Sequence, residues 1–237
     1  AGAGLPVVLA TPEKYTGIQA SLGRVQLQGI SVLKLIATDL SLKQNSTSVA
    51  SGSLLDWSAV DGDTDGVEIN PATDPALEIG GSVGLSIADV VVASATVNLS
   101  KTPVTGIDDP NDAGAQTLLG DLLEVSVTDA NLFIGTGASL DDAAYLDPPT
   151  NSVPNPSFGD ATLPASNDPA AVGFAVANGS FDLAVFTATS EDADGAGAGL
   201  PVVLATPEKY TGIQASLGRV QLQGISVLKL IATDLSL

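Results

Sequence analysis

A stretch of 42 residues that occurs twice constrains the fold of this chain more than any other feature. Residues 1–42, which begin AGAGLPVVLATPEKYTGIQ, return without a substitution as residues 196–237, at an offset of 195 positions. Duplicated domains normally diverge, so an unchanged copy indicates a period of 195 residues followed by the first 42 residues of the next period. A window of a long tandem array explains this best; an engineered overlap and a very recent duplication are the alternatives.

The predicted domain organisation is one β-rich repeat over residues 1–195 and the beginning of an identical repeat over residues 196–237. Such a period is long enough for one domain with its own core, or for two small ones. Because the two copies have the same sequence, we expect residues 18–42 and 213–237 to adopt the same conformation in equivalent settings. The duplicated stretch is interpreted as the junction at which one period meets the next.

The composition restricts both the core and the chemistry. Hydrophobic residues make up 44% of the chain and aromatic residues only 4%, with no Met, Cys or His, so the core must consist of Val, Leu, Ile and Ala. Without Cys and His the chain can form no disulfide, zinc site, or Ser-His-Asp or Cys-His catalytic arrangement. The acidic residues fall in turns without an aromatic-lined cleft, so we expect no enzyme. No apolar run approaches the roughly 18–20 residues that span a membrane.

The net charge of −19 is unevenly distributed. Each copy of the duplicated stretch carries +1, so residues 43–195 carry −21. This balance argues against nucleic acid as a partner. Two interpretations stay open: a solvated, self-repelling surface, or acidic segments that meet a less acidic segment of the next period or bind divalent cations.

Alternation of polar and apolar residues predicts half-buried β-strands along most of the chain. Four segments share a rhythm of two alternating strands joined at a small-residue kink: residues 23–42, 81–100, 122–135 and 172–190. Units of this kind cannot bury their apolar faces alone and must stack on neighbours. The predicted fold class is all-β, with an elongated repeat structure that is β-solenoid-like or made of stacked β-sheet units. β-sandwich domains in tandem are the alternative.

The duplicated stretch is predicted to contain two strands. Residues 17–28 alternate clearly, and Gly29 and Ile30 form a break or bulge. A helix is conceivable for residues 31–42 on their spacing, but the absence of caps favours a strand.

Further local predictions concern the middle of the chain. Residues 76–100 should form two strands joined near Ala88 and Asp89. The beginning of residues 116–140 is compatible with a helical turn, and the rest is predicted as strand. The single Trp57 is expected to pack as a lid over the core.

The acidic loop DGDTDGVE over residues 61–68 is the best candidate for a ligand site. Carboxylates at alternate positions can wrap a hard cation such as calcium, and the following Gly permits a sharp turn. The loop is not an EF-hand, because the position of the usual Glu is Ala72; Asn70 or Asp74 would complete the shell. The alternative is a solvated acidic turn. The predicted calcium ligands of this loop are Asp61, Asp63, Asp65 and Glu68.

Two further acidic clusters are weaker candidates for calcium, because acidic turns without metal are common. One lies in the sequence IDDPND around Asn111, and the other precedes the second copy of the duplicated stretch. The carboxylates of the first are Asp108, Asp109 and Asp112, and those of the second are Glu191, Asp192 and Asp194.

The segments FDLAVFTATSEDADG, DANLFIGTG and YTGIQASLGRVQLQGISVLKLIATDLSLKQN, together with the strand pairs, resemble the long repeats of giant bacterial surface proteins. In those proteins β-rich units recur many times along very long chains. The resemblance covers most of the period and rests on strand rhythm and composition. It implies secretion, adhesion or a cell-surface filament, and it brings no catalytic residues.

Two functions follow as expectations. The first is a structural repeat unit of an extracellular fibre, filament or giant surface protein, built by axial stacking of β-strands, with further copies of itself as partners. The second is an adhesin module, organised by calcium, that binds carbohydrate such as a cell-surface glycan, or a neighbouring cell. Periods joined covalently and periods from separate subunits both satisfy the sequence pattern.

Overall fold

The computed structural model describes most of the chain, and the predicted all-β fold class is confirmed. Residues 12–27, 30, 32–49, 53–60, 66–111, 116–140, 161–162, 171–192, 201–224 and 230–237 are described. They hold ten strands and one helix of four residues, α1 (Trp57–Val60). No helix in these ranges has the length and apolar character needed to cross a membrane.

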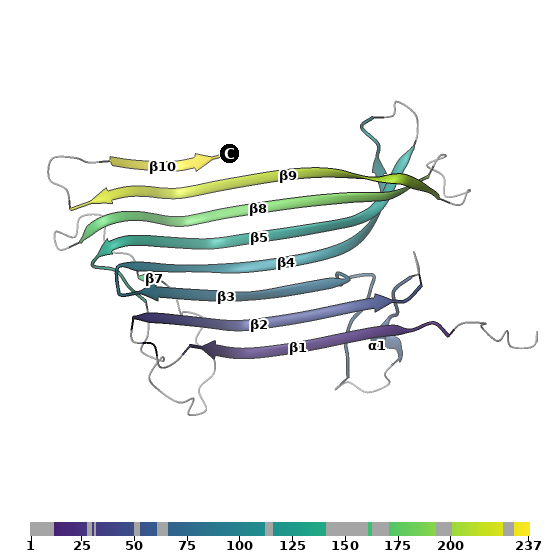
Figure 1. The fold of residues 1–237 in the computed structure, drawn as a ribbon, viewed down its shortest axis with the longest axis horizontal. Coiled ribbons are helices and arrows are strands. Elements are labelled where there is room, and N and C mark those ends of the chain that lie inside the picture. Colours follow the sequence, from purple (N-terminus) through teal and green to yellow (C-terminus); the bar gives the residue numbers. More distant parts are fainter. Residues whose placement is uncertain are drawn as a thin grey trace, which may run out of the picture.

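Eight strands form one open antiparallel sheet, in which each strand pairs with the next one of the sheet along the chain (Figure 1). A solenoid would stack parallel strands from successive coils, whereas the described strands form an antiparallel meander. The order across the sheet is β1 (Tyr15–Gln26), β2 (Leu33–Thr47), β3 (Leu77–Ile87), β4 (Val91–Asp108), β5 (Thr117–Thr136), β8 (Val172–Asp192), β9 (Val202–Gln223) and β10 (Leu230–Ser236).

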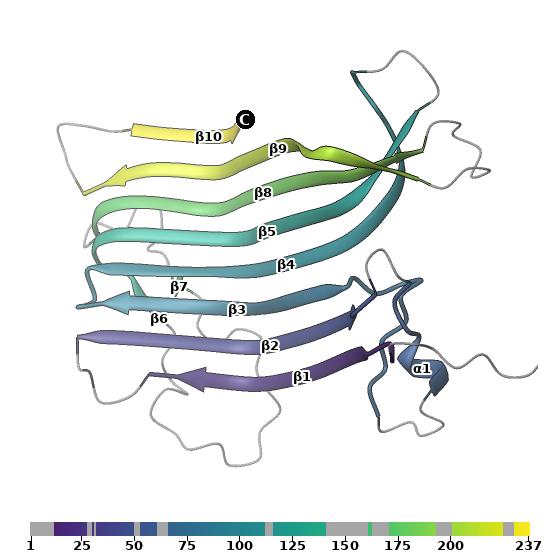
Figure 2. The same ribbon diagram turned by 45° about the vertical axis from the view of Figure 1, so that its right-hand side comes forward.

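One face of the sheet carries a buried core near the turn between β3 and β4. The short strands β6 (Ser139–Leu140) and β7 (Ala161–Thr162) pair with each other and lie against this face (Figure 2). Leu140 of β6 belongs to a buried cluster with Val92 of β4 and Phe133 of β5. We call this side of the sheet the covered face and the opposite side the open face.

Residues in the left-handed backbone conformation interrupt several strands near their middle. Asp39 in β2, Asp129 in β5, Asn178 in β8 and Asp234 in β10 have φ angles between 52° and 55°. Asp and Asn tolerate this conformation because their short polar side chains can bond locally to the backbone. The pairing register shifts next to Asp39 and Asp129, which identifies β-bulges at these positions.

A bulge keeps the apolar residues on one face while the sequence pattern slips by one position. Leu35 and Leu42 lie on either side of Asp39 and differ in parity. Their partners in β3, Leu85 and Ile79, nevertheless belong to one regularly alternating series. The slip explains the mixed spacing that made a helix conceivable in this part of the sequence, where the strand prediction is confirmed.

The small-residue kinks expected in the sequence are of two kinds. Ala88 and Asp89 have φ angles of 52° and 53° and form a tight turn, closed by the Val90 N–H, which donates to the Ile87 carbonyl at 3.0 Å. The predicted turn is therefore confirmed. The kinks of the third and fourth segments lie inside the single strands β5 and β8. The helical turn considered for the start of β5 is wrong, because this strand runs from Thr117 and pairs there with β4 and β8.

Trp57 lies over the β1–β2 hairpin at the edge of the sheet. It is not part of either buried cluster of the described residues, so it does not cover the core as predicted. A Cβ atom on Gly17 of β1 would lie only 2.6 Å from the indole ring, so the ring rests directly on the glycine backbone. The indole N–H donates to the Asn45 side-chain oxygen at 3.0 Å, and the Asn45 amide donates to the Leu55 carbonyl at 2.8 Å. These contacts tie the segment containing α1 to the sheet.

The duplicated sequence supplies a matched pair of variants that tests the packing of Trp57 on Gly17. Gly17→Ala should lower the free energy of unfolding by about 1–3 kcal/mol, because the new methyl group overpacks against Trp57. Gly212→Ala changes the equivalent residue, where an added Cβ meets no atom within 4 Å. It should be neutral or stabilise by up to about 1 kcal/mol, because Ala costs less backbone entropy than Gly in a strand. Urea denaturation followed by Trp57 fluorescence measures the free energy of unfolding of both variants. An equal decrease in the two variants would contradict the packing of Trp57 on Gly17.

Candidate interface between repeats

The two copies of the duplicated stretch form the same hairpin. In the first copy Arg24 pairs with Thr38, and in the second Arg219 pairs with Thr233, which are the same residues displaced by 195. Every pair of β9 with β10 has its counterpart, 195 positions earlier, in the hairpin of β1 and β2 or in the turn-side contact of Leu27 with Leu35. The prediction of equal conformations is confirmed for these described pairs. The prediction of equivalent settings is wrong, because the first copy pairs inward through β2 and the second through β9.

A side-chain contact repeats as well. The Tyr15 hydroxyl donates to the Glu13 carboxylate at 2.7 Å, and the Tyr210 hydroxyl donates to the Glu208 carboxylate at 2.6 Å. The identical sequence therefore gives both copies the same backbone register and the same Tyr–Glu hydrogen bond.

The two hairpins occupy opposite edges of the sheet (Figure 1). In the first copy the second strand, β2, pairs inward with β3, and β1 forms the edge. In the second copy the first strand, β9, pairs inward with β8, and β10 forms the edge. Together, the two copies show which strand pairs with each side of the hairpin: β8 beside its first strand and β3 beside its second.

The pairing of β8 with β9 joins the first period to the second, and we call it the seam. It extends from Gly173 opposite Gln223 to Glu191 opposite Val202, with one register shift near Ala188. Residues 207–209 are part of β9, whereas their counterparts, residues 12–14, are not strand. The strand is therefore longer in the copy that has β8 beside it.

Side chains also meet across the seam. The rings of Phe186 in β8 and Tyr210 in β9 stack with centroids 6.1 Å apart and planes inclined by 23°. The Asn111 side-chain amide, from the loop after β4, donates to the Tyr210 hydroxyl at 3.0 Å. The hydroxyls of Ser180 and Ser216 form a hydrogen bond of 2.7 Å.

A second buried cluster depends on residues from both periods. Leu118 and Phe186 of the first period are buried, and Leu204 and Tyr210 of the second pack against them. The second copy thus completes a core that the first period leaves open on this side. Repeat proteins share this property, because each unit buries part of its apolar surface only against the next one.

The hydrogen bond to Glu208 also sets the acidity of Tyr210. Donation to this carboxylate favours the protonated phenol, and burial and the nearby negative charges act in the same direction. Together they raise the pKa of Tyr210 from 10.0 to about 12, although the bond from Asn111 opposes the shift.

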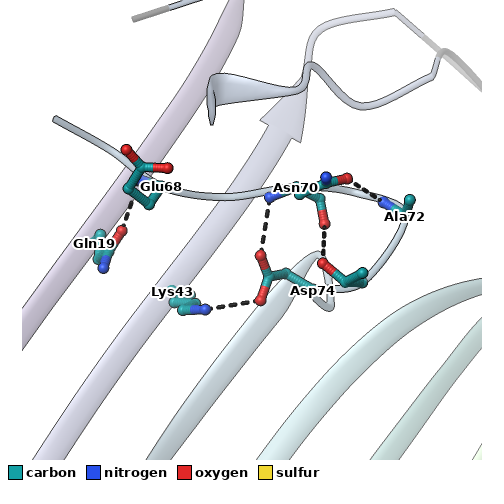
Figure 3. Close-up of polar contacts among 7 residues, drawn as sticks. Gln19, Lys43, Glu68, Asn70, Ala72 and Asp74 are labelled. Carbon is teal, nitrogen blue, oxygen red and sulfur yellow. Dashed lines mark hydrogen bonds and ion pairs between the residues drawn. The ribbon is translucent and has the colours of Figure 1, made fainter. Parts of the chain in front are cut away.

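Four of the predicted calcium ligands, Asp61, Asp63, Asp65 and Asp112, lie outside the described residues. Glu68 is described, and its backbone N–H donates to the Gln19 side-chain oxygen at 2.9 Å (Figure 3). This bond holds the Glu68 backbone against β1. The calcium prediction for the loop before it stays a prediction.

Asp74, considered as a ligand to complete the calcium shell, has structural partners in the protein. Its carboxylate accepts bonds from the Lys43 ammonium at 2.7 Å and from the Asn70 N–H at 2.9 Å (Figure 3). The bond from Lys43 is the main cause that lowers the pKa of Asp74. The residue ties the turn before β3 to β2.

The other acidic candidates are placed at strand ends. Asp108 pairs with Thr117 at the end of β4, and the Asp109 carboxylate accepts a bond from the Asn111 N–H at 2.8 Å. Glu191 and Asp192 end β8, while Asp194 is not described. Within the described ranges, no three Asp or Glu residues gather closely enough to hold a metal ion.

Sequence reasoning missed the residues of the seam. Phe186, Asn111 and Tyr210 lie far apart in the sequence and carry no motif. Only the knowledge that β8 neighbours β9 brings them together. The one available signal was the duplication, which marked Tyr210 as part of a junction.

Comparisons with models of known protein families, with curated proteins and with solved structures found no match.

The raised pKa of Tyr210 gives a pH-dependent signal of its hydrogen bond with Glu208. The neutral phenol is favoured in the folded chain, so its contribution to stability is complete below pH 10 and is lost as the pH rises through about 12. The difference in tyrosinate absorbance between the parent chain and Tyr210→Phe isolates this titration. Glu208→Gln should lower its midpoint toward 10.0, and a midpoint that does not move would refute the assigned cause.

Proposed function

We propose that this chain is a structural repeat unit of an extracellular fibre, filament or giant surface protein, without catalytic activity, whose periods join edge to edge into one continuous antiparallel sheet. The observation that carries the proposal is that one hairpin, in one register, occupies both edges of the sheet. β1 has the sequence of the part of β9 that pairs with β8, and β10 has the sequence of part of β2, which pairs with β3. Each free edge therefore matches an edge that is paired elsewhere in the molecule.

The number of strands in a period supports continuous growth. From the first hairpin to the second, the sheet contains six strands, namely β1, β2, β3, β4, β5 and β8. In an antiparallel sheet an even number returns the next hairpin to the direction of the first. A further period can thus add to β10 with the β2–β3 pairing, and a preceding period can add to β1 with the seam pairing.

The seam supplies a driving force for this addition. Strand pairing satisfies the N–H and C=O groups that an edge strand leaves open. Leu204 and Tyr210 cover the cluster around Leu118 and Phe186, and burial of apolar surface stabilises by about 25 cal/mol per Å². A period without a successor would lack both contributions on the β8 side.

An extracellular location is part of the same proposal, and the resemblance to repeats of giant surface proteins supports it. A continuous sheet serves such a protein by spanning distance with few exposed edges. Periods linked in one chain and periods added as separate subunits would use the same pairing.

A chain of residues 1–195 tests the proposal, because it leaves the complementary outer sides of β1 and β8 unpaired. We expect it to assemble into long unbranched polymers through the seam pairing. The 237-residue chain, in which the second hairpin covers β8, should form only species of finite size. Electron microscopy and analytical ultracentrifugation distinguish the two.

A peptide of residues 196–237 serves as the control. It should cap β8 and shorten the polymers, and the same peptide with Tyr210→Ala should do so less effectively. The proposal fails if the 1–195 chain folds but stays monomeric, or if the peptide does not change the length of its assemblies.

A further inference from the structure

The open face of the sheet consists of rows of apolar side chains that run across the strands. Residues directly opposite each other in paired strands lie on the same face, so the pairing defines these rows. One row crosses the middle of the sheet, and the other lies near the turn between β3 and β4. The middle row is Ala20, Leu42, Ile79, Leu99, Val125, Leu183 and Ile213. The second row is Leu33, Ile87, Val91, Ile134, Phe174, Leu222 and Leu230.

Large side chains of these rows are exposed. Ile79 is 45% exposed, Ile134 46% and Ile213 56%. By contrast, Val92 and Phe133 on the covered face are completely buried. Single exposed apolar residues are ordinary on protein surfaces, but rows of them across a whole sheet mark an interaction surface.

Charges are sorted between the two faces. Glu78, Glu124 and Asp182 each precede a member of the middle row, so alternation places them on the covered face. Lys101, two positions beyond the middle row in β4, is neutralised by Asp121 at 2.9 Å. A charged partner would therefore find nothing on the two rows to complement its charge.

The area of the open face suits a stable protein interface. Between the two rows, six strand spacings of about 4.8 Å and eight residue rises of about 3.4 Å span a patch of roughly 800 Å². A typical stable interface buries about 800 Å² on each partner. Open sheets seldom grow beyond about ten strands unless they curl, flatten or pack as two layers.

We propose that the open face of one copy packs against the open face of a second copy, which gives a two-layered β-sandwich. A second copy meets every requirement of the surface: it is apolar, equally wide and free of charge on the matching rows. Aligned sheets pack about 10 Å apart with their inner side chains interdigitated. Glu78, Glu124 and Asp182 of the covered faces then point outward on both sides, so these carboxylates stay out of the interface.

This pairing does not require the seam, since it uses a face and not an edge. The two can therefore fail separately: the edge-to-edge assembly is read from polymers of the 1–195 chain, and the face pairing from the oligomeric state of the 237-residue chain. If both hold, two continuous sheets share one core and have the same period along their length.

Sedimentation of the full 237-residue chain tests the face pairing. We expect a dimer of twice 23.6 kDa. Ile79→Lys places an unpaired charge at the centre of the interface and should weaken the dimer by about 30-fold or more. Asn98→Lys adds the same charge to the opposite face, one position from Leu99 in β4, and should leave the dimer intact. Circular dichroism verifies that both variants retain the sheet.

Hydrogen exchange separates face pairing from edge pairing. A face-to-face dimer leaves the outward backbone amides of β1 and β10 in fast exchange, whereas an edge-to-edge dimer slows them. Three results would overturn the proposal: a parent chain that stays monomeric, including one that binds phosphatidylcholine vesicles instead; a dimer that Ile79→Lys does not weaken; or a dimer that protects the edge amides.

Discussion

The backbone pairing between β8 and β9 is the interaction on which the rest of this structure depends. An open sheet always leaves two edge strands with unpaired N–H and C=O groups, and proteins must cover such edges or block them. Here the strand that covers β8 belongs to the second copy of the duplicated stretch. Its side chains also complete a buried cluster of the first period through Leu204 and Tyr210. Residues 1–195 therefore complete this cluster only together with a copy of the duplicated stretch.

A sheet that continues from one period to the next requires two things to recur after each period: the strand direction, and the face on which the apolar side chains lie. Six antiparallel strands restore the direction. Keeping the apolar side chains on one face is harder, because a bulge shifts the alternation of side chains by one residue. The bulges at Asp39 and Asp129 come with a matching slip in the apolar pattern, so apolar residues stay on the open face along the whole sheet. The slip is built into the duplicated stretch itself, since Asp234 has the conformation of Asp39.

Much of the secondary structure could be predicted from the sequence, because alternation and turn chemistry act locally. The strands of the duplicated stretch, the turn at Ala88 and Asp89 and the equality of the two hairpins all follow from such signals. The arrangement of the strands could not be predicted, because alternation with a period of two is the same in parallel and antiparallel sheets. An elongated solenoid was therefore as consistent with the pattern as the meander that formed. The contacts of Tyr210 with Phe186 and Asn111 could not be predicted for the same reason, since they depend on which strands are neighbours.

If periods join edge to edge as proposed, each one lengthens the same sheet by six strands, whatever the identity of any single residue. The most direct measurement is the axial repeat of a chain that contains several complete periods, by cryo-electron microscopy or fibre diffraction. Six strand spacings of about 4.8 Å give a rise of about 29 Å per period. Independent globular domains of this length would instead appear as beads about 40 Å apart, and that spacing would contradict edge-to-edge joining of the periods.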